Sequence, residues 1–109
     1  MNSRKKPTEN RNKQSKRKPE KVELRLYVTG QTPRSVRAIE NLRNFCAKFL
    51  TGRFDLEVID IYQQPALAAE VQLLAAPTLI KTAPLPVRRL VGDFSDQERV
   101  VSGLDLNAA

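Results

Sequence analysis

The chain of 109 residues is long enough for one domain, and its formal net charge of +7 lies in its first 21 residues. One cysteine excludes an intramolecular disulfide and a multi-cysteine metal site, and the absence of histidine removes the commonest general base and metal ligand. Since no apolar run approaches the roughly 20 residues that span a bilayer, we expect no membrane segment, no cofactor and a cytoplasmic location.

Residues 1–21 are predicted to form a disordered basic tail ahead of a folded domain over 22–109. The tail holds nine Lys or Arg, two Glu and no apolar residue except Met1, so it cannot offset the entropy of ordering. It is interpreted either as a solvated extension or as a weak contact for nucleic acid through counterion release. It has no aromatic residue on which bases could stack.

The first strand and the first helix are predicted from their apolar spacing. Apolar and polar residues alternate over 22–28, which is typical of a strand with one buried face. Thr32 can cap the following helix, and Pro33 suits its first position. Gly52 is predicted as the C′ glycine that ends it. Apolar residues recur between them at intervals of three and four: Val36, Ile39, Leu42, Phe45, Cys46, Phe49 and Leu50.

A second strand and a second helix follow. Residues 54–61 are rich in β-branched and apolar side chains, and the end of this run is apolar on both faces. That pattern is typical of a central strand covered on both sides. Pro65 then opens a short helix over 65–75, which consists of good helix formers.

Two further strands and a last helix complete the pattern. A strand is predicted over 78–82, the prolines of "APLP" turn the chain, and another strand follows over 87–91. Ser95 and Glu98 form a capping-box pattern that predicts a helix over 96–104. The resulting α/β order is βαβαββα. We expect a parallel, right-handed first crossover and an antiparallel pair around "APLP".

This order, with Pro77 directly before the third strand, resembles the thioredoxin fold. The resemblance implies a cis peptide bond before Pro77, and the alternative is a trans proline that only separates helix from strand. Thioredoxin chemistry requires a C-x-x-C pair in the loop that here reads "TGQTPRS". Cys46 lies on the apolar stripe, where we expect a small buried side chain rather than a reactive thiol. A redox enzyme is therefore disfavoured, and no catalytic residue is expected.

Most of the domain also resembles the KaiB family. The segments "LRLYVTGQTPRSVRAIENL", "LEVIDIYQQPALA", "LLAAPTLIK" and "PLPVRRLVGDFSDQERVVSGLDL" carry the resemblance from Val22 to Leu106. It implies a circadian clock protein that is no enzyme and that has two folds. One is a resting fold of order βαββααβ that assembles into a tetramer. The other is a thioredoxin-like monomer that binds the ATPase KaiC.

The resemblance also implies partners and the residues that meet them. A KaiC-like ATPase, KaiA, a competing KaiB-like sensor kinase and further copies of this chain are the expected partners. Arg34, Arg37 and Lys81 are expected to contact a partner, and for each the alternative is a plain solvated charge. The family's lysines on the second strand and second helix are replaced by Glu57, Val71 and Gln72. Charge reversal at Glu57 disfavours an acidic docking patch, so we expect a divergent partner.

Five residues of the second half are expected to set the balance between the two folds: Pro77, Pro84, Pro86, Gly103 and Asp105. Good helix formers lie beside a β-like run in "LLAAPTLIK", and Gly103 costs a helix about 0.5–1 kcal/mol relative to Ala. Such conflicting local preferences allow two packings of similar free energy. The alternative is an ordinary single fold with a glycine near a helix end. We expect Gly103→Ala or Asp105→Arg to shift the equilibrium between oligomer and monomer.

Overall fold

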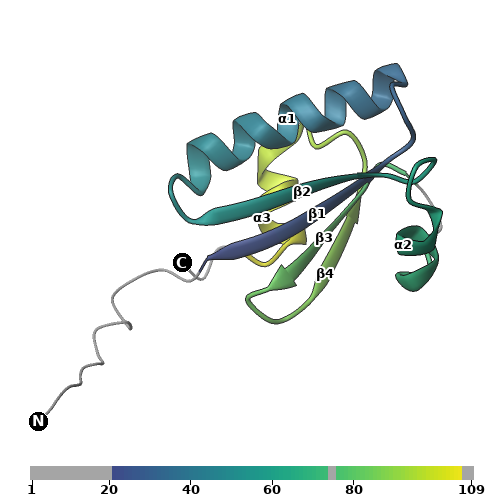
Figure 1. The fold of residues 1–109 in the computed structure, drawn as a ribbon. Coiled ribbons are helices and arrows are strands. Elements are labelled where there is room, and N and C mark those ends of the chain that lie inside the picture. Colours follow the sequence, from purple (N-terminus) through teal and green to yellow (C-terminus); the bar gives the residue numbers. More distant parts are fainter. Residues whose placement is uncertain (1–20, 74–75, 107–109) are drawn as a thin grey trace, which may run out of the picture.

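A four-stranded mixed sheet with helices on both faces forms the domain (Figure 1). The computed structural model describes residues 21–73 and 76–106. The strand order across the sheet is β2-β1-β3-β4. The elements are β1 (Val22–Val28), α1 (Pro33–Phe49), β2 (Phe54–Asp60), α2 (Pro65–Glu70), β3 (Thr78–Ala83), β4 (Arg88–Val91) and α3 (Gln97–Gly103).

The predicted order βαβαββα and the predicted strand directions are confirmed. β1 and β2 are parallel, whereas β3 is antiparallel to both β1 and β4. The predicted central position of the second strand is wrong, because β2 lies at an edge of the sheet. Helices on both faces explain its apolar pattern: Val58 packs against the core beneath α1, and Ile59 lies in the cluster beneath α2. Two covered faces therefore do not require two neighbouring strands.

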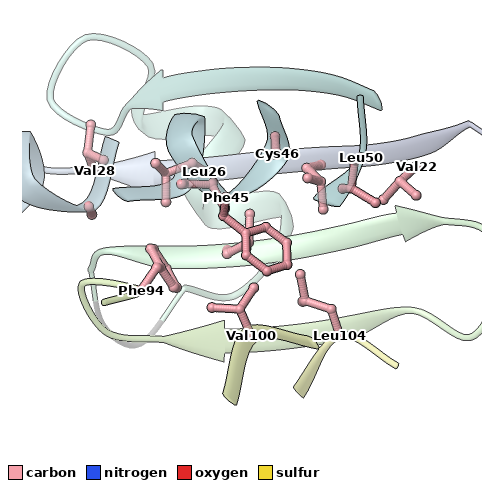
Figure 2. Close-up of a cluster of buried hydrophobic side chains, with 13 residues drawn as sticks. Val22, Leu26, Val28, Phe45, Cys46, Leu50, Phe94, Val100 and Leu104 are labelled. Atoms are coloured by element: carbon pink, nitrogen blue, oxygen red, sulfur yellow. The ribbon is translucent and has the colours of Figure 1, made fainter. Parts of the chain in front are cut away.

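The main core lies between the sheet and the pair of helices α1 and α3 (Figure 2). Alternate residues of β1 point into it, and Phe45 and Leu42 of α1 are fully buried there. The second half of the chain supplies further buried side chains: Leu79, Phe94, Val100 and Leu104. Burying one such side chain contributes about 1.5–3 kcal/mol, so this mixed core holds both halves of the chain together.

A smaller apolar cluster lies on the opposite face of the sheet, beneath α2. Tyr27, Ile59 and Ile80 form its buried part, and Leu67 and Val71 pack against them. Helix α2 is shorter than predicted, since it ends at Glu70. The prediction that this helix reaches residue 75 falls partly on residues 74–75, which lie outside the described residues.

Local side-chain chemistry fixes the ends of α1. Thr32 is its N-cap, its hydroxyl accepts a hydrogen bond from the Ser35 N–H at 3.2 Å, and Pro33 takes the first turn as predicted. The C-cap is Leu50, so Gly52 is not the C′ residue and that prediction is wrong. Gly52 lies one residue further on with a φ of 74°, where the chain turns toward β2.

The start of α3 differs from the predicted capping box. Asp96, not Ser95, is the N-cap, and its carboxylate accepts a hydrogen bond from the Arg99 N–H at 3.1 Å. The backbone N–H of Ser95 instead donates to the Asp93 carboxylate at 3.1 Å. Ser95 and Asp96 are both residue types that cap helices, so the sequence left the position of the N-cap uncertain by one residue.

Because Asp96 satisfies an N–H group at the start of α3, we expect Asp96→Ala to lower the free energy of unfolding by about 1 kcal/mol. Ser95→Ala is the matched control, and its effect should be clearly smaller. Urea unfolding followed by circular dichroism measures both. A larger loss for Ser95→Ala than for Asp96→Ala would contradict this assignment of the cap.

Candidate interaction surfaces

Arg34 and Arg37 lie on the exposed side of the first turns of α1. The buried side of the same turns holds Ser35 and Ala38, both without exposed surface. Residues 34 and 37 are one helical turn apart and therefore lie on the same side of the helix. The structure thus brings these two predicted contact residues together on one solvent-facing basic surface.

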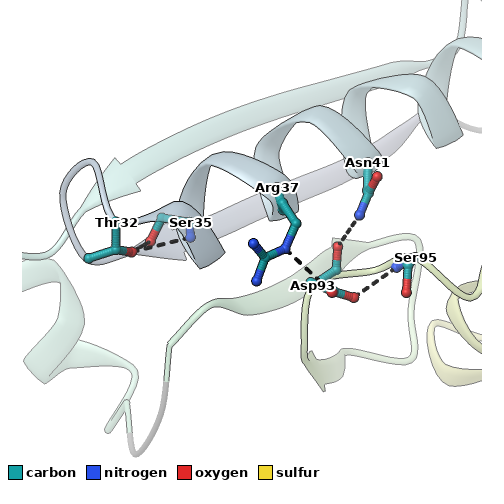
Figure 3. A network of polar contacts seen from close by, with 6 residues as sticks. All are labelled: Thr32, Ser35, Arg37, Asn41, Asp93 and Ser95. Carbon is teal, nitrogen blue, oxygen red and sulfur yellow. Dashed lines mark hydrogen bonds and ion pairs between the residues drawn. The ribbon is translucent and has the colours of Figure 1, made fainter.

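Arg37 and Asn41 also attach the loop before α3 to α1 (Figure 3). The Arg37 Nε lies 4.0 Å from the Asp93 carboxylate, and the Asn41 Nδ2 donates to the Asp93 carbonyl at 2.9 Å. Hydrogen bonds from Ser95, with the nearby positive charge of Arg37, hold the pKa of Asp93 below its usual value. Arg37 is therefore exposed on α1 and also contacts the loop before α3, so part of its charge is already used within the chain.

The loop that Asp93 anchors carries a core side chain. Phe94 has a φ of 63°, an unusual conformation for a bulky residue, yet its side chain is only 5% exposed. The conformation is held by the burial of the Phe94 ring and by the hydrogen bonds that Asp93 accepts from Asn41 and Ser95. Nothing in the local sequence, apart from Gly92 two residues earlier, indicated this conformation.

Lys81 differs from the expectation of either a contact residue or a solvated charge. It is only 1% exposed and lies on β3 opposite Leu24 of β1, on the same face of the sheet as α1 and α3. Burial lowers the pKa of its ammonium group, Asp105 opposes this shift, and Arg88 adds to it. Because Lys81 has almost no accessible surface in this conformation, a partner cannot contact its side chain directly.

The residues expected to control the fold do not form one cluster. Pro77 precedes β3, whereas Pro84 and Pro86 lie in the turn at its other end, and all three follow cis peptide bonds. The expected cis bond before Pro77 is therefore present. Gly103 ends α3, where a Cβ atom would lie 3.0 Å from the Leu90 Cδ1 of β4. Asp105 has a φ of 58° just beyond that helix. Their role in choosing between folds stays a prediction.

The loop between β1 and α1 holds hydroxyl groups where a thioredoxin has its cysteine pair. Thr32 donates to the Ser35 hydroxyl at 2.8 Å, and the Thr29 N–H donates to the same oxygen at 3.1 Å. The thiol of Cys46 is buried in the main core, and burial raises its pKa to about 11. Such a thiol has almost no thiolate at neutral pH and is a poor nucleophile.

A second exposed surface lies on the open part of the sheet beyond α2. Acidic side chains dominate it: Asp55 and Glu57 of β2 have side chains that are 72% and 59% exposed, and Glu23 of β1 is exposed beside them. Glu57 was singled out from the sequence as a residue that affects docking, whereas Asp55 and Glu23 were not. The available signal was their position in the two predicted strands: Asp55 and Glu57 are two residues apart and therefore lie on the same face, and Glu23 is a polar residue of the alternating first strand.

Residues 21–73 and 76–106 contain neither a candidate metal site nor a helix that could span a membrane. Within these ranges no cluster of three or more His, Cys, Asp or Glu side chains could hold a metal ion. The helices described there also include none that is long and apolar enough to cross a membrane.

Comparison with known proteins decides the family. Residues 25–106 match the KaiB domain family. The chain belongs to the KaiB family. It is 54% identical over 83 residues to the circadian clock oscillator protein KaiB of Synechococcus sp. strain RCC307, which covers 76% of each chain. It is 53% identical over 83 residues to KaiB of Synechococcus elongatus strain PCC 7942, covering 76% of this chain and 81% of that protein.

The solved structures that this KaiB-family domain resembles are thioredoxin-like. The N-terminal domain of SasA from Synechococcus elongatus matches with a TM-score of 0.67 and 24% identity, covering 90% of this chain and 94% of the other. Chloroplastic thioredoxin z matches with a TM-score of 0.64 and 19% identity, covering 83% and 81%. The thioredoxin-like fold expected from the sequence is therefore confirmed, whereas the tetrameric resting fold stays a prediction.

The pKa of Asp93 gives a pH-dependent prediction. A depressed carboxyl pKa contributes stability above the ordinary pKa, and this contribution is lost as the pH falls through the depressed value. Asp93→Asn should therefore be less stable than the wild-type chain at pH 7, with a difference that shrinks as the pH falls below the ordinary Asp pKa of about 3.9. Urea unfolding across this range measures it. Glu40→Gln, at an exposed position of α1, is the control, and an equal difference at all pH values for Asp93→Asn would contradict the anchor.

Proposed function

We propose that this KaiB-family protein is a regulatory binding protein of a circadian clock or a related timing or stress system. It acts by docking onto a KaiC-like ATPase and catalyses no reaction itself. The observation that carries the proposal is the identity of 54% and 53% over 83 residues to two proteins named circadian clock oscillator protein KaiB. The buried thiol of Cys46 and the absence of a cysteine pair make a redox enzyme the weaker candidate.

The exposed side of α1 is the proposed docking surface for the ATPase. Arg34 and Arg37 project there from a long helix with a capped start, so their backbone positions are fixed before a partner arrives. Fixed charges contribute mainly to the rate and specificity of association with a surface of opposite sign. The partner should therefore present carboxylates to the first two turns of α1.

A change of fold is the second part of the proposal. The thioredoxin-like form described here is the one that docks, and a resting form with the order βαββααβ assembles into a tetramer. Gly103 and Asp105 support this role because both lie where the chain leaves α3 and Gly103 packs closely against β4. KaiA and a competing sensor kinase are further proposed partners within the same system.

The partner can be identified by capture from an extract of the source organism. The full chain is immobilised and the extract is applied with and without ATP. The expected result is nucleotide-dependent retention of a KaiC-like ATPase. Retention of nucleic acid alone, lost when residues 1–21 are removed, would instead favour the nucleic-acid interpretation of the tail.

Substitutions on α1 test the docking surface. We expect Arg34→Ala and Arg37→Ala each to weaken binding of the purified ATPase by about tenfold, equivalent to about 1.4 kcal/mol. Arg43→Ala is the matched control, because residue 43 lies on a different side of the same helix. Isothermal titration measures all three. Since Arg37 also contacts Asp93, the Arg34 variant is the cleaner test. Equal losses for Arg34→Ala and Arg43→Ala would refute the assigned surface.

A further inference from the structure

Helix α2 covers only one end of its face of the sheet. It packs over Tyr27, Ile59 and Ile80, near the ends of β1 and β2, and Figure 1 shows it beside that end. No helix among the described residues covers the part of the same face near the beginnings of β1 and β2. A shallow depression of about 280 Å³ lies there, lined by Glu23, Leu24, Arg25, Asp55, Leu56, Glu57 and Thr82.

This open part of the sheet carries more acidic than basic groups. Glu23, Asp55 and Glu57 line it, and Glu70 at the end of α2 is near enough to act electrostatically on Arg25. Arg25 lies 3.6 Å from the Glu57 carboxylate, and Lys21 lies 3.6 Å from the Asp55 carboxylate. Both pairs are largely exposed and therefore weak, so these carboxylates remain available to additional cations.

The chain itself contains a segment of opposite charge, residues 1–20, which joins the sheet at the beginning of β1. Residues 1–20 hold eight Lys or Arg and two Glu. They precede β1, whose first residue Val22 donates its N–H to the Arg53 carbonyl at 2.9 Å, directly before β2. Lys21, the residue that joins the segment to β1, already lies against Asp55. Twenty residues reach up to about 66 Å when extended, so length does not restrict which part of this face they contact.

We propose that residues 1–20 bind the open acidic part of the sheet of their own chain. The covalent connection gives the segment a high effective concentration at Glu23, Asp55 and Glu57, which a separate basic peptide would lack. Nucleic acid is a poor occupant of this surface, because its phosphates would meet carboxylates of the same sign. An apolar partner is also unsuited, since charged side chains line most of the depression. Any protein that approaches β2 from this side must displace the segment.

The experiment uses the full chain with one nitroxide spin label. Ser15→Cys supplies the attachment site, and Cys46 remains in place because its thiol is fully buried. We expect loss of amide NMR intensity at residues 23–25 and 55–57, with little loss at α3. The loss should disappear at 1 M salt, where the Debye length falls to about 3 Å. Equal broadening over all faces, or broadening that survives 1 M salt unchanged, would overturn the electrostatic contact.

A pair of charge-matched variants tests the surface directly. Asp55→Asn with Glu57→Gln should restore most of the lost intensity at residues 23–25. Glu40→Gln with Glu98→Gln removes two exposed charges from α1 and α3 and should restore none. Amide spectra of the unlabelled variants verify that each one folds. If both variants respond alike, the acidic part of the sheet is not the site.

A mixed sample separates contact within one chain from contact between chains. Isotope-labelled protein without the nitroxide is combined with unlabelled protein that carries it. We expect no loss of intensity in this mixture, because the contact is internal. Loss at residues 23–25 in the mixture would overturn the proposal in favour of exchange between two copies.

Discussion

The burial of α1 against a sheet built from both halves of the chain is the constraint on which this structure depends. Leu42 and Phe45 belong to the first half, whereas Leu79, Val100 and Leu104 belong to the second, and all lie in one core. Neither half can bury its apolar surface in this arrangement without the other. In the folded chain, β3, β4 and α3 complete the core that the first βαβ unit begins. The loop at Asp93 adds polar contacts to the same junction.

This dependence explains why the second half is the place to expect an alternative packing. The first βαβ unit has long elements with matching local preferences: α1 is capped by Thr32, and β1 alternates regularly. The second half has a short α2, a four-residue β4 and a seven-residue α3. Such short elements are marginal alone, and their buried side chains lie in the same core as those of α1 and β1. Under the proposed change of fold, this segment is therefore the one that we expect to take a different set of contacts.

Much of the fold could be predicted from the sequence because most elements are locally consistent. The alternation of β1, the apolar stripe of α1 and the proline before β3 sufficed for the order and the strand directions. The edge position of β2 could not be read from its apolar end, because helices rather than strands cover its faces. The burial of Lys81 was also missed, since a single lysine in a strand gives no sign of its environment. The left-handed Phe94 is fixed by its burial in the core, which no local pattern reveals.

The candidate surfaces were predicted less completely than the fold. Arg34 and Arg37 could be placed on one side of α1 by helical spacing alone, but the contact between Arg37 and Asp93 joins residues far apart in sequence. The acidic part of the sheet requires the register of β1 against β2, which sets Glu23 beside Asp55 and Arg25 beside Glu57. The molecule thus presents a basic helix surface and an acidic sheet surface. Their opposite charges mean that one partner surface cannot suit both.

Amide hydrogen exchange of the chain, free and bound to its ATPase partner, tests the docking claim most directly. We expect slower exchange on binding in the first two turns of α1 and in the loop at Asp93, which is anchored to that helix. These segments should respond together, because the same side chains join them. Unchanged exchange throughout α1, with protection confined to other elements, would contradict the proposed mode of binding.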